Sequence, residues 1–213
     1  MSSSESSKEL RVKGDAEEAT SEERKEAVRK LAGAIAHSLR GHGEVKVRCF
    51  GSSCVSKAAR AIAIAREYME DHDLELYCVP AFIEADMDGK SKTGLSMHIL
   101  AEKRGPPQPD SERVDLKVRS DPPNVTDEER RVAVRKLAGA VAHVIRSDKQ
   151  LTVRCFGSAS IGKAVKAIAI ARGFVATGGH DLFCVPSFIE ADMGGQTKTG
   201  ISFKVVVGGQ TSG

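Results

Sequence analysis

The sequence predicts an α+β protein built from two tandem domains, each a four-stranded mixed sheet with two helices on one face. Three observations predict this class. The 213-residue chain repeats itself, because Leu10 to Gly94 correspond to Leu116 to Gly200 without insertion or deletion. Each copy shows strand-like and helix-like patterns in the order strand, helix, strand, helix, strand, strand. Between the copies lies "RGPPQPDSER", whose proline and charge predict a semi-extended linker.

The repeat sets the predicted domain boundaries. Matching segments include "VRKLAGAIAHSLR" with "VRKLAGAVAHVIR", and "VRCFGSSCVSKAARAIAIAR" with "VRCFGSASIGKAVKAIAIAR". Each copy has the length of an independent domain. The predicted organisation is a disordered tail over 1–8, domains over 9–104 and 114–208, a linker over 105–113, and a second tail over 209–213.

The first strand and first helix of each copy have clear signals. The alternating run "ELRVKG" predicts a short strand. Thr20 or Ser21 then precedes an acidic pair, as Thr126 does in the second copy, and this pattern is typical of a helix N-cap. Apolar residues at i, i+3 and i+4 spacing from Val28 to Leu39 predict the helix that follows.

The other elements follow in order. "EVKVRCFG" alternates with period two and predicts the second strand, after which Gly51 and Ser52 form a break and a cap for the second helix. "LELYCVPAFIEADM" predicts a third strand that is interrupted at Pro80. Asp88-Gly89 and Gly194-Gly195 predict turns into the last strand of each copy.

Small residues mark two faces of the second helix. In the run "AIAIA" the alanines allow close approach and Ile62 and Ile64 point to different sides, so one side is expected to pack on the sheet and the other on a neighbouring helix or subunit. The sequence therefore predicts an intrachain pseudo-dimer or a homo-oligomer, with the basic residues of this helix facing solvent.

Composition excludes several classes. No apolar run approaches the roughly 18 residues needed to cross a bilayer, and the N-terminus has no signal peptide, so we expect no membrane association and a cytoplasmic location. The five cysteines show no zinc-ligand spacing and are expected to be reduced and buried, without metal or cofactor. Seven Phe, two Tyr and no Trp leave few platforms on which single-stranded bases could stack.

The sequence does not favour an enzyme. His37 and His143 correspond between the copies, but no nucleophile accompanies either at a recognisable spacing, so both are expected on a helix surface or at an interface. The carboxylate pairs Glu84/Asp86 and Glu190/Asp192 lack a completing group and are expected to be solvated or salt-bridged. "GSSCVSK" lacks the pattern of a phosphate-binding P-loop.

Cationic residues that recur in both copies are the candidate binding residues. Two lie near the start of the second helix, behind glycine and serine residues whose backbone N–H groups favour an anion at the helix N-terminus. A basic pair lies on the first helix, and a lysine follows each hairpin turn. The candidates are Lys57, Arg60, Lys163 and Lys166; Arg29, Lys30, Arg135 and Lys136; Lys92 and Lys198; and, as anion-binding helix N-termini, Gly51, Ser52, Gly157 and Ser158.

The alternative interpretation of these cations is structural. They would then be solvated helix faces, or charges that discourage edge-to-edge strand pairing. The charge distribution makes the second copy the better candidate for phosphate binding. Leu10 to Arg104 carry 16 basic and 16 acidic residues, whereas Arg113 to Gly213 carry 15 basic and 9 acidic residues, a net charge of +6.

The repeated segments of both copies resemble the stage V sporulation protein S family, a branch of the Alba-like superfamily. The resemblance covers nearly all of both copies and rests on "LAGAIAHSLR", "GSSCVSKAARAIAIARE" and "DLFCVPSFIEADMGG". It implies a compact βαβαββ fold, a tendency to dimerise, and nucleic-acid binding by analogy with Alba proteins. One departure concerns the loop before the first helix, which is basic in Alba-like proteins. Here it is acidic, "GDAEEATSEER" or "SDPPNVTDEER", and would repel phosphates.

Two functions are therefore predicted for further testing. The first is a non-enzymatic nucleic-acid-binding protein that contacts DNA or RNA backbone with little sequence specificity. The alternative is a structural or interaction subunit of a larger protein assembly, for example cytoskeletal or ciliary, that has kept the fold and lost nucleic-acid binding. The acidic loops and the neutral first copy favour the alternative.

Overall fold

A computed structural model describes residues 8–87, 89–103 and 112–208 of the chain. Almost all of the predicted N-terminal tail, most of the predicted linker and the whole C-terminal tail lie outside these residues.

Both repeats have the predicted order of elements. The first contains β1 (Lys8–Arg11), α1 (Ser21–His42), β2 (Glu44–Cys49), α2 (Ser52–Glu67), a 3-10 turn (Glu70–His72), β3 (Leu74–Met87) and β4 (Lys90–Lys103). The second contains β5 (Arg113–Val118), α3 (Asp127–Arg146), β6 (Gln150–Cys155), α4 (Ser158–Ala176), β7 (Asp181–Asp192) and β8 (Thr197–Gly208).

Each repeat forms the predicted four-stranded mixed sheet. In the first repeat β1 pairs parallel with β2, while β2–β4 and β4–β3 are antiparallel; the second repeat is built in the same way. The two half-sheets join into one eight-stranded sheet of order β1-β2-β4-β3-β7-β8-β6-β5. The junction is antiparallel and is registered at Cys78 opposite Cys184, so equivalent residues of the two repeats face each other.

The sequence predicted an interruption of the third strand at Pro80, and this prediction is wrong. β3 runs through Pro80, which lies opposite Met97 of β4. On its other side the ladder of β3 with β7 has, among the described residues, the single pair Cys78 and Cys184, so a proline two residues beyond that junction removes no ladder hydrogen bond. The carbonyl oxygen of Pro80 is used instead by the other repeat, since it accepts a hydrogen bond from Arg172 at 2.8 Å.

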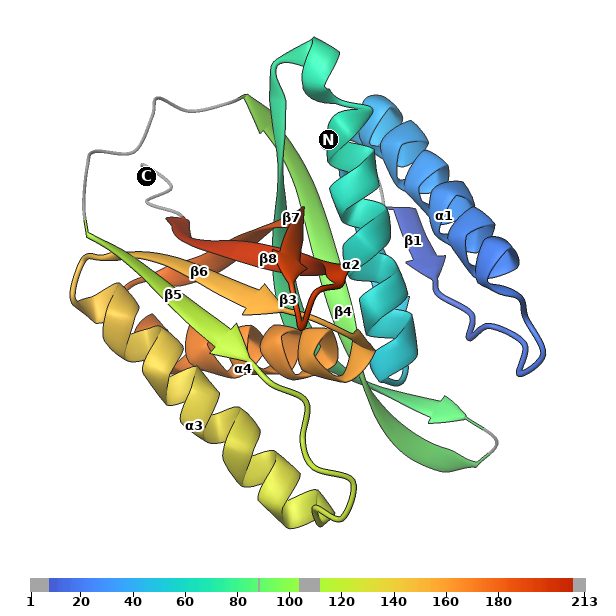
Figure 1. Ribbon diagram of the computed structural model, residues 1–213. Coiled ribbons are helices and arrows are strands. Elements are labelled where there is room, and N and C mark those ends of the chain that lie inside the picture. Colours follow the sequence, from blue (N-terminus) through green and yellow to red (C-terminus); the bar gives the residue numbers. More distant parts are fainter. Residues whose placement is uncertain (1–7, 88, 104–111, 209–213) are drawn as a thin grey trace.

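The second helices form the centre of the molecule. α2 and α4 contact each other, and each also contacts the third strand of the other repeat, α2 on β7 and α4 on β3. α1 packs on α2 and α3 packs on α4, so the first helices lie outermost (Figure 1). The helices approach closely because small residues line the contact; a Cβ on Gly162 would lie 3.0 Å from the Cβ of Ser52. The predicted two-sided packing of the second helix is confirmed for α2.

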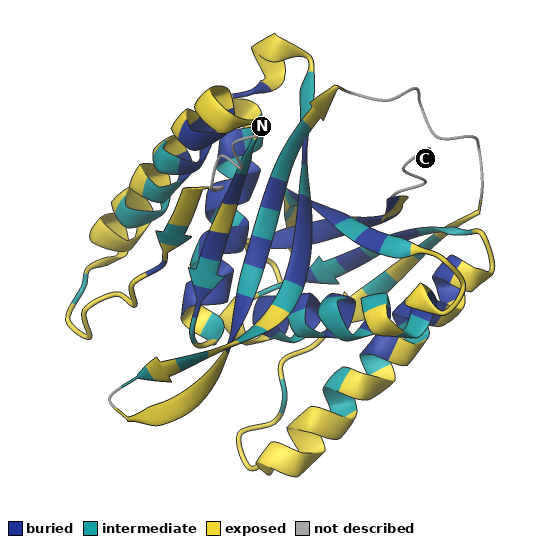
Figure 2. Ribbon diagram, turned by 180° about the vertical axis from the view of Figure 1, so that it is seen from behind, coloured by how far each residue is buried: buried dark blue, intermediate teal, exposed yellow. Residues whose placement is uncertain are grey.

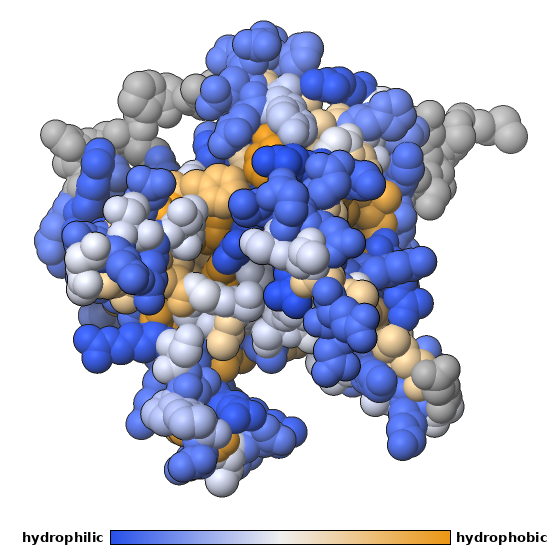
Figure 3. All heavy atoms as spheres, turned by 45° about the vertical axis from the view of Figure 1, so that its right-hand side comes forward, coloured by the Kyte–Doolittle hydropathy of each residue, from blue (hydrophilic) through white to orange (hydrophobic). Residues whose placement is uncertain are grey.

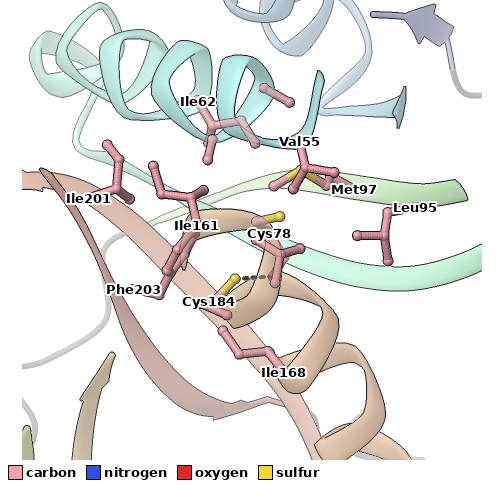
Figure 4. Close-up of a cluster of buried hydrophobic side chains, with 14 of the residues drawn as sticks. Val55, Ile62, Cys78, Leu95, Met97, Ile161, Ile168, Cys184, Ile201 and Phe203 are labelled. Atoms are coloured by element: carbon pink, nitrogen blue, oxygen red, sulfur yellow. Dashed lines mark hydrogen bonds between the residues drawn. The ribbon is translucent and has the colours of Figure 1, made fainter. Parts of the chain in front are cut away.

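One hydrophobic cluster spans both repeats. It includes Ile62 and Met97 of the first repeat and Ile161 and Phe203 of the second, all fully buried (Figure 4). Figure 2 shows buried positions alternating along the central strands, while the outer helices are exposed on the side away from the sheet. At the centre the thiol of Cys184 donates to the carbonyl oxygen of Cys78 at 3.3 Å. The two repeats therefore share one core and not two separate ones.

Two arginines fasten the repeats to each other. Arg66 of α2 binds Glu75 of its own repeat at 2.7 Å and donates to the Pro186 carbonyl and the Ser187 hydroxyl of the other repeat. Arg172 of α4 makes the equivalent pair with Asp181 at 2.6 Å and reaches back to Pro80. No helix within the described ranges is long and apolar enough to cross a membrane.

Candidate nucleic-acid interface

Some of the acidic residues near the starts of α1 and α3 form contacts within the chain. Thr20 accepts a hydrogen bond from the backbone of Glu23, and the Glu23 carboxylate accepts one from the backbone of Thr20, which is a complete capping box. Thr126 and Glu129 form the same box on α3. These hydrogen bonds from threonine lower the pKa of both glutamates. The two glutamate carboxylates stabilise the N-termini of α1 and α3, and this role explains why acidic residues occur in these segments.

The predicted outward orientation of Lys57 and Lys163 is wrong. Only 10% of the Lys57 side chain and 14% of the Lys163 side chain are exposed. Lys57 forms an ion pair with Asp15 and donates to the carbonyl oxygen of Lys13. Lys163 binds Asp121 and Arg119 in the same way. Each lysine fastens the loop after the first strand to the second helix, because the loop supplies both a charge and a carbonyl. These two lysines are therefore engaged within the chain and are poorly placed to bind phosphate.

The starts of α2 and α4 are glycine-capped. Gly51 and Gly157 have φ of 91° and 90°, a conformation that favours glycine, and no side chain in the described part of the chain caps either helix. The predicted capping role of Ser52 is therefore wrong. Gly51, Gly157 and Ser158 are exposed, while Ser52 is half-buried where it meets Gly162 of the other repeat.

The second basic position of the second helix differs from the first. Arg60 and Lys166 are half-buried, and neither forms an ion pair with any residue in the described part of the chain. The Nε atom of Arg60 is buried without a hydrogen-bond partner among those residues. A buried N–H group without an acceptor is rare in folded proteins and calls for a specific explanation.

The basic pairs on the first helices have different surroundings in the two repeats. In α1, Arg29 lies 3.5 Å from Glu22 and 3.8 Å from Glu26, and Lys30 lies 4.0 Å from Glu26. In α3, Arg135 and Lys136 are exposed and form no ion pair with other described residues. The position of Glu26 is occupied in α3 by Val132, which is 42% exposed. This replacement removes the partner that would lie three and four residues before the basic pair.

The hairpin lysines are placed at the surface. Lys92 and Lys198 are exposed on β4 and β8, next to the turns that join the last two strands of each repeat. Lys92 also lines a cleft of about 440 Å³ together with Phe50 and Met87.

With the α1 side of the molecule turned forward, Figure 3 shows a surface that is mostly hydrophilic, with apolar residues confined mainly to recesses.

The residues considered for catalysis do not converge on a site. His37 and His143 are exposed on α1 and α3. Asp86 and Asp192 accept backbone hydrogen bonds within their hairpin turns, from Gly89 and Gly195. Among the described residues no group of His, Cys, Asp and Glu side chains could hold a metal ion. All five cysteines are buried and unpaired, as predicted, and burial raises the pKa of Cys49 and of Cys155 to about 12.

The structure identifies three positions of interest that the sequence patterns did not. Arg24 and Phe188 line a cleft that contains Arg60, and Val132 of α3 stands at the position of Glu26, which contacts Arg29 and Lys30 in α1. The Glu26-to-Val132 difference is visible in an alignment of the two copies. The position of Phe188 beside α2 is not visible there, because it depends on how the repeats pack.

The topology and its internal repetition define a class: a duplicated α+β protein with two interlocked βαβαββ units. The sequence profile of the stage V sporulation protein S (SpoVS) family matches residues 23–102 and again residues 130–208. The chain therefore belongs to the SpoVS family and carries two copies of its domain, which confirms the resemblance found in the sequence.

Proposed function

We propose that this chain is a non-enzymatic nucleic-acid-binding protein that contacts the phosphate backbone of DNA or RNA through the second repeat, with little sequence specificity. The observation that carries the proposal is the pair Arg135 and Lys136. Both side chains are exposed on α3 and are unpaired within the described part of the chain. Cations without an internal partner need not give up an ion pair when they bind phosphate.

Further cations of the second repeat support this assignment. Lys198 is exposed at the β7–β8 hairpin, and Lys166 lies half-buried on α4 without an ion pair to any described residue. The net charge of +6 on Arg113 to Gly213 adds a general attraction for polyanions. Asp121, an acid of the loop before α3, is already neutralised by Lys163, so it opposes phosphate less than its sequence suggests.

The experiment is a salt series of equilibrium binding with labelled duplex DNA, single-stranded DNA and RNA. Wild-type affinity should fall steeply with salt and depend little on sequence. The double variant Arg135→Gln/Lys136→Gln should weaken binding and reduce the slope of log affinity against log salt by about 2, roughly 1 for each lost phosphate contact.

The matched control is Arg29→Gln/Lys30→Gln on α1. Those cations already have glutamate partners, so the same chemical change should reduce affinity and salt slope much less. Equal losses from the two double variants would contradict the assignment to α3. Absence of salt-sensitive binding at micromolar protein would remove the proposal and leave a protein-assembly role as the function to test next.

A further inference from the structure

We propose that the first repeat holds a separate site for a nucleoside phosphate, in a cleft between α1 and α2. The cleft has a volume of about 730 Å³, within the range of small-molecule sites in proteins. The loop after β1 and the N-terminal half of α1 form one wall, and α2 forms the other. Ser158 and Phe188 of the second repeat complete the lining.

The lining of the cleft is cationic. Five basic side chains line it against two acids, Asp15 and Glu17, and Asp15 is already paired with Lys57. Lys25 and Arg29 share the partner Glu22, which lies outside the lining. Arg24 and Arg60 have no side-chain hydrogen bond or ion pair with any residue that the structure describes. The net charge favours an anion, and these two guanidinium groups remain available to bind it.

Arg60 supplies the strongest single argument. Its Nε–H is buried and has no acceptor among the described residues. A guanidinium group recognises phosphate through two parallel N–H donors, and Nε is commonly one of them. Because this Nε–H is buried, a phosphate oxygen in the cleft reaches it only when the Arg60 side chain turns toward the cleft, and no described residue pairs with that side chain to hold it back. Ser21 and Ser53 place hydroxyl groups on the same lining and can donate to further phosphate oxygens.

Phe188 determines the kind of phosphate compound. It comes from β7 of the other repeat, is 39% exposed and lies on the cleft lining. An exposed aromatic ring beside a phosphate-binding group is the arrangement on which a nucleobase stacks. The site therefore fits a nucleoside phosphate, with its phosphate at Arg24 and Arg60 and its base at Phe188.

The second repeat does not reproduce this chemistry. Lys166 replaces Arg60, and Ala159 replaces Ser53. Asp127 replaces Ser21, and this carboxylate pairs with Arg130, the counterpart of Arg24, at 3.2 Å. The repeats therefore provide matched controls at equivalent positions.

The test is calorimetric titration of the full chain with AMP, GMP, CMP and UMP, and with inorganic phosphate and adenosine. At least one nucleotide should bind more tightly than either of its parts. Arg60→Gln should weaken that nucleotide by about tenfold or more, while the matched Lys166→Gln leaves its affinity unchanged. Phe188→Leu should weaken the nucleotide but not inorganic phosphate, and the matched Phe82→Leu should weaken neither.

Two sources share this ligand chemistry, a free nucleotide and the 5′ end of a nucleic-acid strand. A tetranucleotide with a 5′-phosphate and one with a 5′-hydroxyl distinguish them. Tighter binding of the 5′-phosphorylated strand than of the mononucleotide indicates a strand end, and the reverse order indicates a free nucleotide.

The nucleotide site and the backbone contacts proposed for α3 are separate proposals and can be tested independently. Arg135→Gln/Lys136→Gln should leave mononucleotide affinity unchanged. Absence of binding by all four nucleotides at millimolar concentration would overturn the proposal. Unchanged nucleotide affinity in an Arg60→Gln variant that keeps the wild-type circular dichroism spectrum and thermal midpoint would do so too.

Discussion

The two repeats have the same fold but distribute their charges in opposite ways. In the first repeat Arg29 and Lys30 of α1 are paired with Glu22 and Glu26, while Arg24 and Arg60 remain available inside the cleft. In the second repeat the outer cations Arg135 and Lys136 are unpaired within the described residues, while Arg130 is held by Asp127. A few substitutions on a duplicated scaffold are thus enough to move the available positive charge from a cleft to an exposed helix face.

What the repeats keep in common is the backbone framework. Both carry a glycine where the last strand meets the second, Gly94 and Gly200, and both use an arginine at the end of the second helix to hold the other repeat. These features act on the shared core, so a change in either repeat should affect the whole molecule. The outer cations act locally and can diverge.

The largest effect is expected at Gly200. A Cβ there would lie 2.3 Å from the carbonyl oxygen of Cys155 and 2.7 Å from the Phe156 ring. Because the backbone of Cys155 cannot easily move away from the added Cβ, Gly200→Ala should lower the free energy of unfolding by about 2–4 kcal/mol. The measurement is urea denaturation followed by circular dichroism.

Gly33 of α1 provides the control for this substitution. Its Cβ position is open and its helical backbone suits alanine. Gly33→Ala should therefore stabilise the protein by roughly 0.5–1 kcal/mol. Destabilisation by both variants to the same extent would show that the close approach at Gly200 is not the cause.

A smaller effect is expected at Lys163 of α4, which forms an ion pair with Asp121. Lys163→Met removes the ion pair with Asp121 and the hydrogen bond to Arg119 and leaves a partly buried carboxylate. We expect a loss of about 1–3 kcal/mol of stability, and a similar loss from Lys57→Met in the first repeat. Nucleic-acid affinity in the folded protein should change little. A large loss of affinity with unchanged stability would instead return Lys163 to the interface.

The acid dependence of stability should depend on Asp181. The hydrogen bond from Arg172 is the main cause that lowers the pKa of this carboxyl below its ordinary value of 3.8; burial opposes it, and the hydrogen bond from the Leu182 backbone adds to the lowering. A lowered folded pKa contributes stability that is present above the ordinary pKa and is lost as the pH falls through the lowered one.

The corresponding variant is Asp181→Asn. The gap in thermal midpoint between wild type and Asp181→Asn should be constant near neutral pH and narrow as the pH falls below about 4. A gap that stays the same down to pH 2 would mean that the charge of Asp181 does not contribute.

Much of the fold could be predicted from the sequence because its signals are local and occur twice. The capping threonines, the apolar spacing of α1 and the alternation of β2 depend on near neighbours along the chain, and the structure has all of them. The prediction at Pro80 was wrong because a proline is compatible with a strand position that has no ladder partner on its other side, and β7 pairs with β3 at Cys78 and not at Pro80.

The site was less predictable for a physical reason. The sequence shows that Lys57 and Lys163 are basic and lie off the apolar face of their helix, but not that an aspartate 42 residues earlier folds back onto each of them. Likewise, Arg60 and Phe188 meet the same cleft only because the repeats pack against each other. In contrast, the contacts of Arg29 and Lys30 with Glu26 come from a residue three or four positions away on the same helix, and comparing the two copies is enough to find that α3 lacks this partner.

The exchange of Glu26 and Val132 between the helices tests the central claim most directly. Val132→Glu gives Arg135 and Lys136 the partner that their α1 counterparts have, and Glu26→Val removes that partner from Arg29 and Lys30. Binding of labelled duplex DNA and RNA is measured across a salt series, with Val132→Gln as the neutral control. We predict weaker binding and a shallower salt slope for Val132→Glu, stronger binding for Glu26→Val, and wild-type behaviour for Val132→Gln. Unchanged affinities in both exchanged variants would contradict the claim that ion pairing on the first helix determines which repeat binds.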